Sequence, residues 1–246
     1  MEADAAGFEK SEKALRIHQA LARKFGIAIL SGEYAPGDGF SGEIEQSDAL
    51  GVSRTAYREA LRFLTAKGLL ESRPKAGTHV TPRERWNLLD PDVLEWMFSG
   101  KPDERFIYDL FELRGVIEIA AAQLAAVRHD TDDLARMDRG LAGMRRHGLA
   151  TADGQAADED FHVALLAAAR NEALASLATS VAAAVRWTTR FKQRNQLHPR
   201  DPLPEHEALR DAIASRRPGR ARRAMKELLQ LALADMTHDD RKGRKE

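Results

Sequence analysis

The chain of 246 residues carries 38 basic and 38 acidic side chains, so its formal net charge is zero, and it contains no cysteine. Without cysteine, disulfides, thiolate metal sites and cysteine nucleophiles are excluded, and a reducing, cytoplasmic setting is expected. The longest unbroken apolar run, Val163–Ala169, is far shorter than the roughly 18 residues that predict a membrane span. The acidic N-terminal sequence also lacks the apolar stretch of a secretory signal. We therefore expect no membrane partner, and either one large domain or two smaller ones.

A winged helix-turn-helix is predicted for residues 12–81. Apolar residues recur at helical spacing in three segments, Leu15–Leu30, Glu43–Leu50 and Ser53–Lys67. Gly51 makes a tight turn between the second and third of these helices, and Gly68 ends the third. Two short strands follow, Leu69–Arg73 and Gly77–Thr81, and a hairpin of this size is stable only when it packs on other elements.

The third of these helices has the composition of a DNA-reading helix. Arg54, Arg58 and Arg62 follow one another at intervals of four residues, beside an apolar sector. In a helix-turn-helix the N-terminal end of the second helix enters the major groove, so Arg54, Thr55 and Arg58 are expected to meet base edges, with Ser53 as the N-cap. Arginine suits this task because its planar fork bonds O6 and N7 of guanine together. An ordinary solvated helix face is the alternative.

Positive charge is concentrated in this part of the chain. Residues 51–85 hold eight basic and three acidic side chains, an excess of five positive charges. A net charge of zero therefore does not exclude a phosphate-rich partner. Lys75, Thr78 and His79 at the tip of the hairpin are candidates to contact the phosphate backbone or the minor groove, and simple exposure is the alternative for His79.

Four spaced motifs stand out between residues 32 and 80. They are Gly32-Glu-Tyr-Ala-Pro-Gly, the run 50–64, Lys67-Gly-Leu-Leu and Ala76-Gly-Thr-His-Val. Together they resemble the winged-helix domain of GntR-type bacterial transcription regulators. The resemblance implies contacts with double-stranded DNA through Ser53, Arg54, Thr55, Ala56 and Arg58, and through the wing residues Gly77, Thr78 and His79. Ile44 stands where members of that family commonly carry a basic residue.

The composition changes after residue 81. Residues 82–102 contain three prolines and an Asn-Leu-Leu-Asp-Pro-Asp run, which predicts a linker with one short helix. Residues 103–238 are richer in alanine and show helical periodicity with no convincing strand, so the fold class is mainly α with a C-terminal all-helical bundle. The predicted helices cover about Phe106–Leu124, Thr131–His147, Asp153–Ala169, Glu172–Gln193, Pro204–Ser215 and Pro218–Asp235.

Two histidines and an aspartate in the bundle are candidate metal ligands. Asp158 and His162 are four residues apart and share one face of a predicted helix, and Phe161 and Leu165 indicate that this face borders the core. His206 opens a later helix and is able to converge with them. One carboxylate oxygen and two imidazole nitrogens suit a divalent transition metal. The alternative is that each is an ordinary hydrogen-bonded group of the core or the surface.

This second part looks like the FCD domain of the FadR branch of GntR regulators. The resemblance implies a metal held by Asp158, His162, His206 and one further histidine. That histidine would fall near Ala184–Val185, where the sequence has none, and His198 in a nearby loop is a candidate to take its place. A divalent metal of the zinc, nickel or manganese type is therefore expected on three ligands.

The same resemblance implies a carboxylate-bearing effector beside the metal, with Arg114 as the residue that faces it. A guanidinium is suited to clamp a carboxylate bidentately, whereas a surface salt bridge of Arg114 with Glu112 or Glu118 is the alternative. Arg186, Trp187 and Arg190 form a second cluster, which is expected to line the effector pocket. The alternative is that these side chains only stack on one another as part of the fold.

The sequence of the linker indicates which chemical class of effector to expect. Residues 85–96 are similar to a segment of the subgroup that regulates sugar-acid catabolism, such as galactonate-responsive repressors, so a sugar acid is expected. The predicted function is a ligand-controlled transcription regulator, expected to be a repressor. A homodimer is expected because one winged helix reads only half of a palindrome. The alternatives are a regulator that senses another hydroxy or dicarboxylic acid or an acyl-CoA, and a metal-dependent enzyme, for which no nucleophile motif is present.

Overall fold

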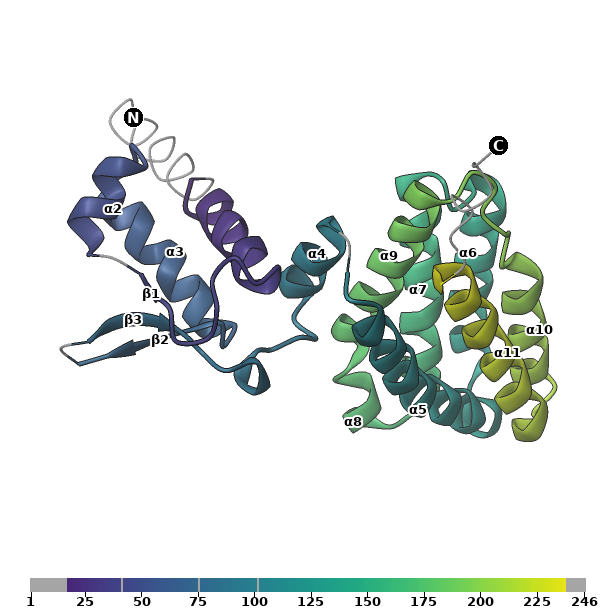
Figure 1. Cartoon of the computed structure of the whole chain (residues 1–246). Coiled ribbons are helices and arrows are strands. Elements are labelled where there is room, and N and C mark those ends of the chain that lie inside the picture. Colours follow the sequence, from purple (N-terminus) through teal and green to yellow (C-terminus); the bar gives the residue numbers. More distant parts are fainter. Residues whose placement is uncertain (1–16, 41, 75, 101, 238–246) are drawn as a thin grey trace, which may run out of the picture. The chain divides into compact units, whose positions relative to one another are not determined.

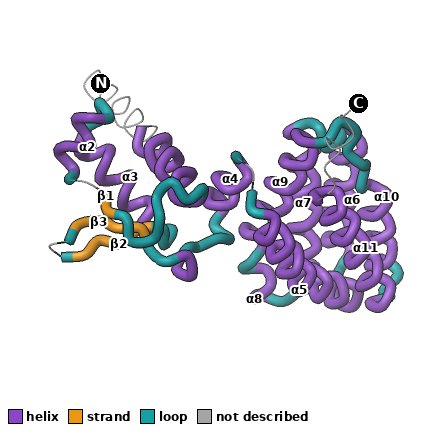
Figure 2. Tube along the Cα trace, viewed as in Figure 1, coloured by secondary structure: helices purple, strands orange, loops and turns teal. Residues whose placement is uncertain are grey.

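A computed structural model describes residues 17–40, 42–74, 76–100 and 102–237 (Figures 1 and 2). The chain divides into two compact units, of which the first ends at Gly100. The ends predicted for the two domains, 12–16 and 238, lie outside the described residues, as does Lys75. Within the part that the structure describes, no helix is both long and apolar enough to cross a bilayer.

The first unit is a winged helix-turn-helix, which confirms the predicted fold class. A helix over residues 17–30 precedes β1 (Gly39–Phe40), α2 (Glu43–Ala49), α3 (Arg54–Ala66), β2 (Leu70–Arg73) and β3 (Gly77–Val80). Figure 2 shows the three strands as one small sheet, in which β3 lies between β1 and β2 and runs antiparallel to both. The sequence pattern missed β1, because a strand of two residues has no periodicity to detect.

The turn between α2 and α3 and the start of α3 follow from local chemistry. Gly51 adopts φ +63°, a left-handed conformation that glycine enters without a Cβ penalty. Ser53 then caps α3, because its Oγ accepts a hydrogen bond from the backbone N–H of Ala56 at 3.1 Å. Tyr57 and Leu64 on the inner side of α3 are fully buried, so the opposite side faces solvent.

The segment 82–100, predicted as part of a linker, packs on the first unit. It contains a 3-10 turn, η1 (Arg83–Arg85), and α4 (Pro91–Ser99). A Cβ added to Gly26 would lie 2.2 Å from the ring of Trp96 on α4, so only glycine fits there. Lys67, at the end of α3, is buried and its Nζ lies 2.7 Å from carboxylate oxygens of both Asp90 and Asp92. Lys67 was counted in the basic excess, yet these two carboxylates neutralise it.

The second unit is all helical in its described residues. Its helices are α5 (Glu104–Arg128), α6 (Thr131–His147), α7 (Ala152–Ala168), α8 (Glu172–Ala175), α9 (Ala178–Asn195), α10 (Leu203–Ala214) and α11 (Pro218–Thr237). The single helix predicted over Glu172–Gln193 is wrong, because it breaks into α8 and α9. At the break, the Ser176 hydroxyl donates to the carbonyl of Ala173 at 2.8 Å, a local bond that competes with continued helix.

The helix α7 occupies the middle of this bundle, as Figure 1 shows, and packs against α5, α6 and α9. The contact with α6 is close, since a Cβ on Gly140 would lie 2.9 Å from the Cβ of Phe161. The helix α11 packs against α5 and α10. Side chains on the inner face of α7 therefore meet those of α5, α9, α10 and α11 in the interior.

Candidate metal and effector site

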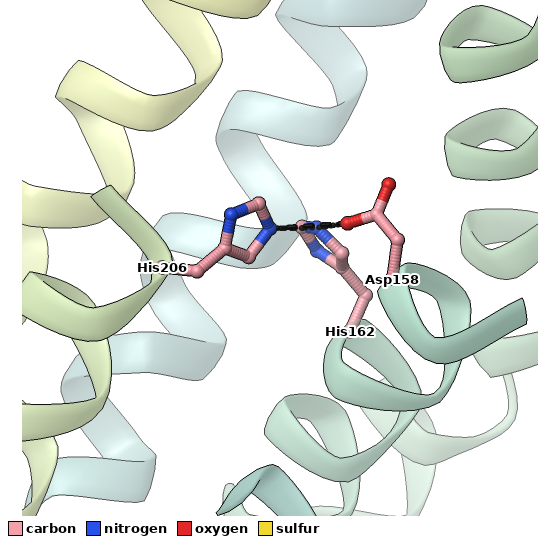
Figure 3. Close-up of side chains that lie close together, drawn as sticks. All are labelled: Asp158, His162 and His206. Atoms are coloured by element: carbon pink, nitrogen blue, oxygen red, sulfur yellow. Dashed lines mark hydrogen bonds and ion pairs between the residues drawn. The ribbon is translucent and has the colours of Figure 1, made fainter. Parts of the chain in front are cut away.

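Asp158 and His162 from α7 and His206 from α10 converge in the bundle interior (Figure 3). All three are almost fully buried, with 2–3% of each residue exposed. Asp158 Oδ1 lies 3.1 Å from His206 Nε2 and 3.7 Å from His162 Nε2, and the two Nε2 atoms are 3.4 Å apart. The structure thus brings together the three ligands that the sequence predicts.

The outer nitrogen of each imidazole is already used. His206 Nδ1 lies 2.8 Å from the carbonyl oxygen of Pro202, which only accepts, so this nitrogen donates and carries the proton. His162 Nδ1 pairs with Glu118 Oε2 in the same way. In the neutral imidazoles both Nε2 atoms then present lone pairs to the centre of the cluster. Such outer partners are what fix the tautomer of metal-ligating histidines.

Asp158 completes a set of donors that suits a metal. Its Oδ1 is buried and makes no hydrogen bond with described residues, and the three ligand atoms lie within 4.8 Å of one another. In the metal-free protein, burial raises the pKa of Asp158, but a hydrogen bond and positive charge from the neighbouring imidazoles, together with Thr189, outweigh it and hold the pKa at about 2, so the side chain is ionised. An anionic oxygen with two imidazole lone pairs fits zinc, nickel or manganese. Without a metal, the same contacts require an extra proton on one Nε2.

Glu118 on α5 belongs to the candidate site, although sequence reasoning considered it only as a surface partner of Arg114. It is fully buried and accepts from His162 with one oxygen and from Arg114 Nε, at 2.6 Å, with the other. Burial raises the pKa of Glu118, but Arg114 and His162 outweigh it and hold the pKa at about 2. The sequence left a surface salt bridge of Arg114 with Glu112 or Glu118 as the alternative. The pair with Glu118 is instead buried, and it connects the predicted effector arginine to His162, one of the three candidate metal ligands.

On α9, where the absent histidine was expected near Ala184–Val185, the polar groups beside the cluster are two hydroxyl groups about one turn further along the helix. Thr189 Oγ1 donates to Asp158 Oδ2 at 3.0 Å, and Thr188 Oγ1 lies 3.5 Å from Arg114 Nη1. Val185 lines the same cavity with its apolar side chain. His198 is exposed and does not join the cluster of Asp158, His162 and His206.

A cavity of about 40 Å³ adjoins the cluster. Arg114, Lys192 and the two threonines add polar groups to its lining, and α11 contributes an apolar side. Trp187 and Arg190 do not line this cavity, contrary to the prediction. At about 100° per residue, Val185, Thr188, Thr189 and Lys192 share the side of α9 that faces the cavity. Trp187 and Arg190 fall on the other side of the same helix. The Arg190 guanidinium instead lies 5.2 Å from the centre of the Trp187 ring.

The start of α3 forms the candidate DNA-reading surface. Ser53, Arg54, Thr55 and Arg58 are all exposed there. Ala56 does not fit the predicted contact set, since it is 4% exposed and its N–H is taken by Ser53. Ala56 lies on the buried side of α3 together with Tyr57 and Ala60.

The wing is the second part of that surface. Gly77 is exposed with φ +89°, and Thr78 and His79 are half-buried. The His79 ring lies 2.7 Å from the carbonyl oxygen of Ala76 and 3.2 Å from that of Gly37, so it links the wing to the loop before β1. Ile44, on α2, is 57% exposed.

Comparisons with known families agree with both units. Residues 17–80 match the bacterial regulatory proteins of the gntR family, and residues 109–231 match the FCD domain. The galactonate operon transcriptional repressor of Escherichia coli is 34% identical over 189 residues, which cover 76% of this chain and 82% of that protein. The chain belongs to the GntR family of transcription regulators.

Further relatives of this GntR regulator have the same kind of function. The transcriptional regulator LutR of Bacillus subtilis is 32% identical over 80% of this chain and 90% of its own. The Uxu operon transcriptional regulator of Escherichia coli is 29% identical over 69% of this chain and 65% of its own. A solved structure described as E. coli McbR/YncC, 18% identical with a TM-score of 0.51, covers 91% of this chain and 96% of that one and shows the fold alone. The chain is a transcription regulator, and none of these relatives supports the alternative of a metal-dependent enzyme.

Proposed function

We propose that this GntR regulator is a repressor whose operator binding is controlled by a small carboxylic acid, a sugar acid in the first place, bound beside a divalent metal. The observation that carries the proposal is the joining of the metal-type cluster to Arg114 through Glu118 in one buried cavity. The identity of 34% to a galactonate operon repressor supports the sugar acid.

The residues of the chain divide the binding task. Asp158, His162 and His206 would hold the metal, and three protein ligands leave coordination positions for oxygen atoms of an effector. Arg114 lines the same cavity. Its Nε donates to Glu118 and its Nη1 lies 3.5 Å from Thr188, so Nη2 is the group that would bind a carboxylate. Thr188 and Thr189 add hydroxyl groups at the border of the cavity for a hydroxylated ligand.

The proposed assembly is a homodimer, because each winged helix reads one half-site of a palindrome. Apolar side chains exposed on α5 are candidates for the interface between the two subunits. Tyr108, Val116 and Val127 are 47%, 69% and 59% exposed. Each subunit would place Ser53, Arg54, Thr55 and Arg58 in a major groove, with the wing residues Gly77 and Thr78 beside it.

A smaller hydroxy or dicarboxylic acid is the second candidate effector. The cavity of about 40 Å³ favours it, because pockets for drug-sized ligands are about 300–1,000 Å³. An acyl-CoA fits this small, partly polar space least.

The test is a metal and ligand analysis of the purified protein. Elemental analysis gives the metal, and thermal shifts of the metal-loaded protein are compared for D-galactonate, succinate, L-lactate and an acyl-CoA. We expect bound metal and the largest shift with D-galactonate. A metal-free protein that gains no stability from any acid would disprove the proposal, and a shift with succinate or lactate alone would select the second candidate.

A further inference from the structure

Lys192 is a buried cation at the border of the effector cavity. It belongs to the inner face of α9, and its side chain is only 6% exposed. Its Nζ lies 3.4 Å from Asp235 Oδ2 and donates to the carbonyl oxygen of Arg200 at 3.2 Å. Both distances are at the long end for hydrogen bonds of an ammonium group. The cation is therefore held loosely by groups of the chain itself.

Asp235, in the last turn of α11, is the carboxylate that holds it. Its Oδ2 also lies 3.3 Å from Arg200 Nε, and 16% of its side chain is exposed to solvent. Its backbone carbonyl accepts a hydrogen bond from Gln196. If Lys192 turned to another anion, Asp235 would still have Arg200 and water as partners, so releasing it leaves no buried charge unpaired.

The size of the cavity requires that something move when an acid binds. About 40 Å³ holds no more than a few water molecules, whereas an acid of several carbon atoms needs several times that space. The apolar wall of the cavity comes from one face of α11, where Ala232 and Met236 flank the turn that carries Asp235. Space gained at this wall would open beside Lys192.

We infer that Lys192 is a second effector-binding residue. In the absence of effector it pairs with Asp235, and when an effector binds it pairs instead with an oxygen at the far end of that effector. This rests on the proposed function, in which the near end of the acid meets the metal cluster and Arg114. The ligand class follows from the two polar ends. It is an acid with oxygen groups at both ends, such as an aldonic acid or a dicarboxylate, and not an acid with an apolar tail.

The transfer of Lys192 from Asp235 to the effector also defines two states of the protein, one with and one without the Lys192–Asp235 contact. Asp235 secures the last turn of α11 to Lys192 and Arg200, and an effector that takes Lys192 weakens that attachment. A ligand shifts a conformational equilibrium only by its differential affinity for the two states. The last turn of α11 is then the element whose position reports occupancy of the site.

The test compares the variants Lys192→Met and Asp235→Asn in the full-length, metal-loaded protein. The matched control is Glu227→Gln, which changes an exposed residue on α11, the helix that carries Asp235. The probes are D-galactonate, succinate and butyrate, measured by calorimetry, and Zn²⁺ titration shows that the metal cluster is intact. Lys192→Met should weaken binding of galactonate or succinate roughly 10-fold or more, as expected for loss of a charged hydrogen bond. Asp235→Asn should tighten it several-fold, since the competing carboxylate is gone. The affinity for butyrate, which has no oxygen group at its far end, should be the same in both variants as in the wild-type protein.

The decisive result is that the two substitutions change effector affinity in opposite directions, although Lys192 and Asp235 form one ion pair. If Lys192 and Asp235 only supported the fold, both changes would weaken binding together, and that outcome overturns the inference. Unchanged affinity in both variants overturns it as well. If no acid binds the metal-loaded wild-type protein, the effector part of the proposed function fails instead. In the absence of acid, Asp235→Asn should also speed amide exchange over residues 232–237, and equal exchange in wild type and variant contradicts the attachment of α11.

Discussion

The Nε2 atoms of His162 and His206 lie 3.4 Å apart in the bundle interior, and neither has a proton to give the other when each ring donates through Nδ1. Two lone pairs so close together repel unless a cation or a proton lies between them. Asp158 supplies the negative charge on the same side. A divalent cation bound by both nitrogens, or one extra proton between them, would relieve this repulsion, and Glu118 and the Pro202 carbonyl are the groups that orient the two rings.

Replacing Glu118 with glutamine should weaken metal binding. The amide keeps the shape of the side chain but lacks the charge that makes His162 a stronger ligand, and loss of such an outer partner lowers metal affinity about 10- to 100-fold. Zn²⁺ titration by calorimetry measures the effect. Glu112→Gln, an exposed change on the same helix, is the control and should leave the affinity as in wild type. Equal affinity in Glu118→Gln and wild type would show that Glu118 does not orient a ligand.

The sequence was sufficient to predict that Asp158, His162 and His206 lie together, but not to predict the groups around them. Asp158 and His162 could be placed on one helix face by their spacing. His206 was a candidate from its place at the start of a later helix, and the resemblance to FCD domains implied the same three residues. The burial of Glu118 could not be predicted, because its i, i+4 spacing from Arg114 is the same for a pair on the surface and for a pair in the core. Whether the pair is buried depends on how α5 packs against α7. Helical phase caused the other error, since Trp187 shares α9 with the cavity-lining Thr188 but projects elsewhere.

In the N-terminal unit, prediction succeeded where local chemistry decides the structure. The Ser53 cap and the Gly51 turn are read directly from residue types, and the structure contains both. The pairing of Lys67 with Asp90 joins residues 23 positions apart in sequence, which no local pattern reveals. A charge count alone therefore overestimated how much positive charge is available to DNA.

Metal binding should stabilise the protein through Asp158. A ligand that binds only the folded state at 100 times its Kd adds about 2.7 kcal/mol to the free energy of unfolding. We expect Zn²⁺ to raise the melting temperature of the wild-type protein by several degrees and EDTA to reverse the rise. Asp158→Asn keeps an acceptor for Thr189 but removes the anionic ligand, so most of the rise should disappear. The exposed neighbour Asp160→Asn is the control, and loss of the rise in that variant would point to non-specific binding.

A buried carboxylate at the start of α6 should make stability depend on acid pH. Burial raises the pKa of Asp133, but Arg170, Arg136 and the N–H of Asp130 outweigh it and hold the pKa at about 2, below the ordinary 3.8. Because the folded pKa is the lower one, the ionised group stabilises the fold above the unfolded pKa, by about 2 kcal/mol. That contribution is lost as the pH falls through the folded pKa.

Asp133→Asn should therefore lower the free energy of unfolding by about 2 kcal/mol near pH 7, and the deficit should shrink as the pH approaches about 2. Urea unfolding at a series of pH values measures both quantities. Asp132→Asn, an exposed change in the same helical turn, should track the wild-type curve. A deficit that stays constant with pH would mean that Asp133 acts through packing or capping and not through its charge.

Arg54 and Arg58 should each contribute to operator binding through the exposed start of α3. Truncating either to alanine is expected to cost about 1–3 kcal/mol, since a bidentate arginine contact to guanine carries base-specific binding energy. Gel-shift titration on a fragment selected from a random DNA pool measures the loss. Arg62 lies further along α3 and pairs with Glu59 at 2.8 Å, so Arg62→Ala should cost less and serves as the control. If Arg54→Ala and Arg58→Ala bind as wild type while Arg62→Ala does not, the middle of α3, and not its N-terminal end, is the part that enters the groove.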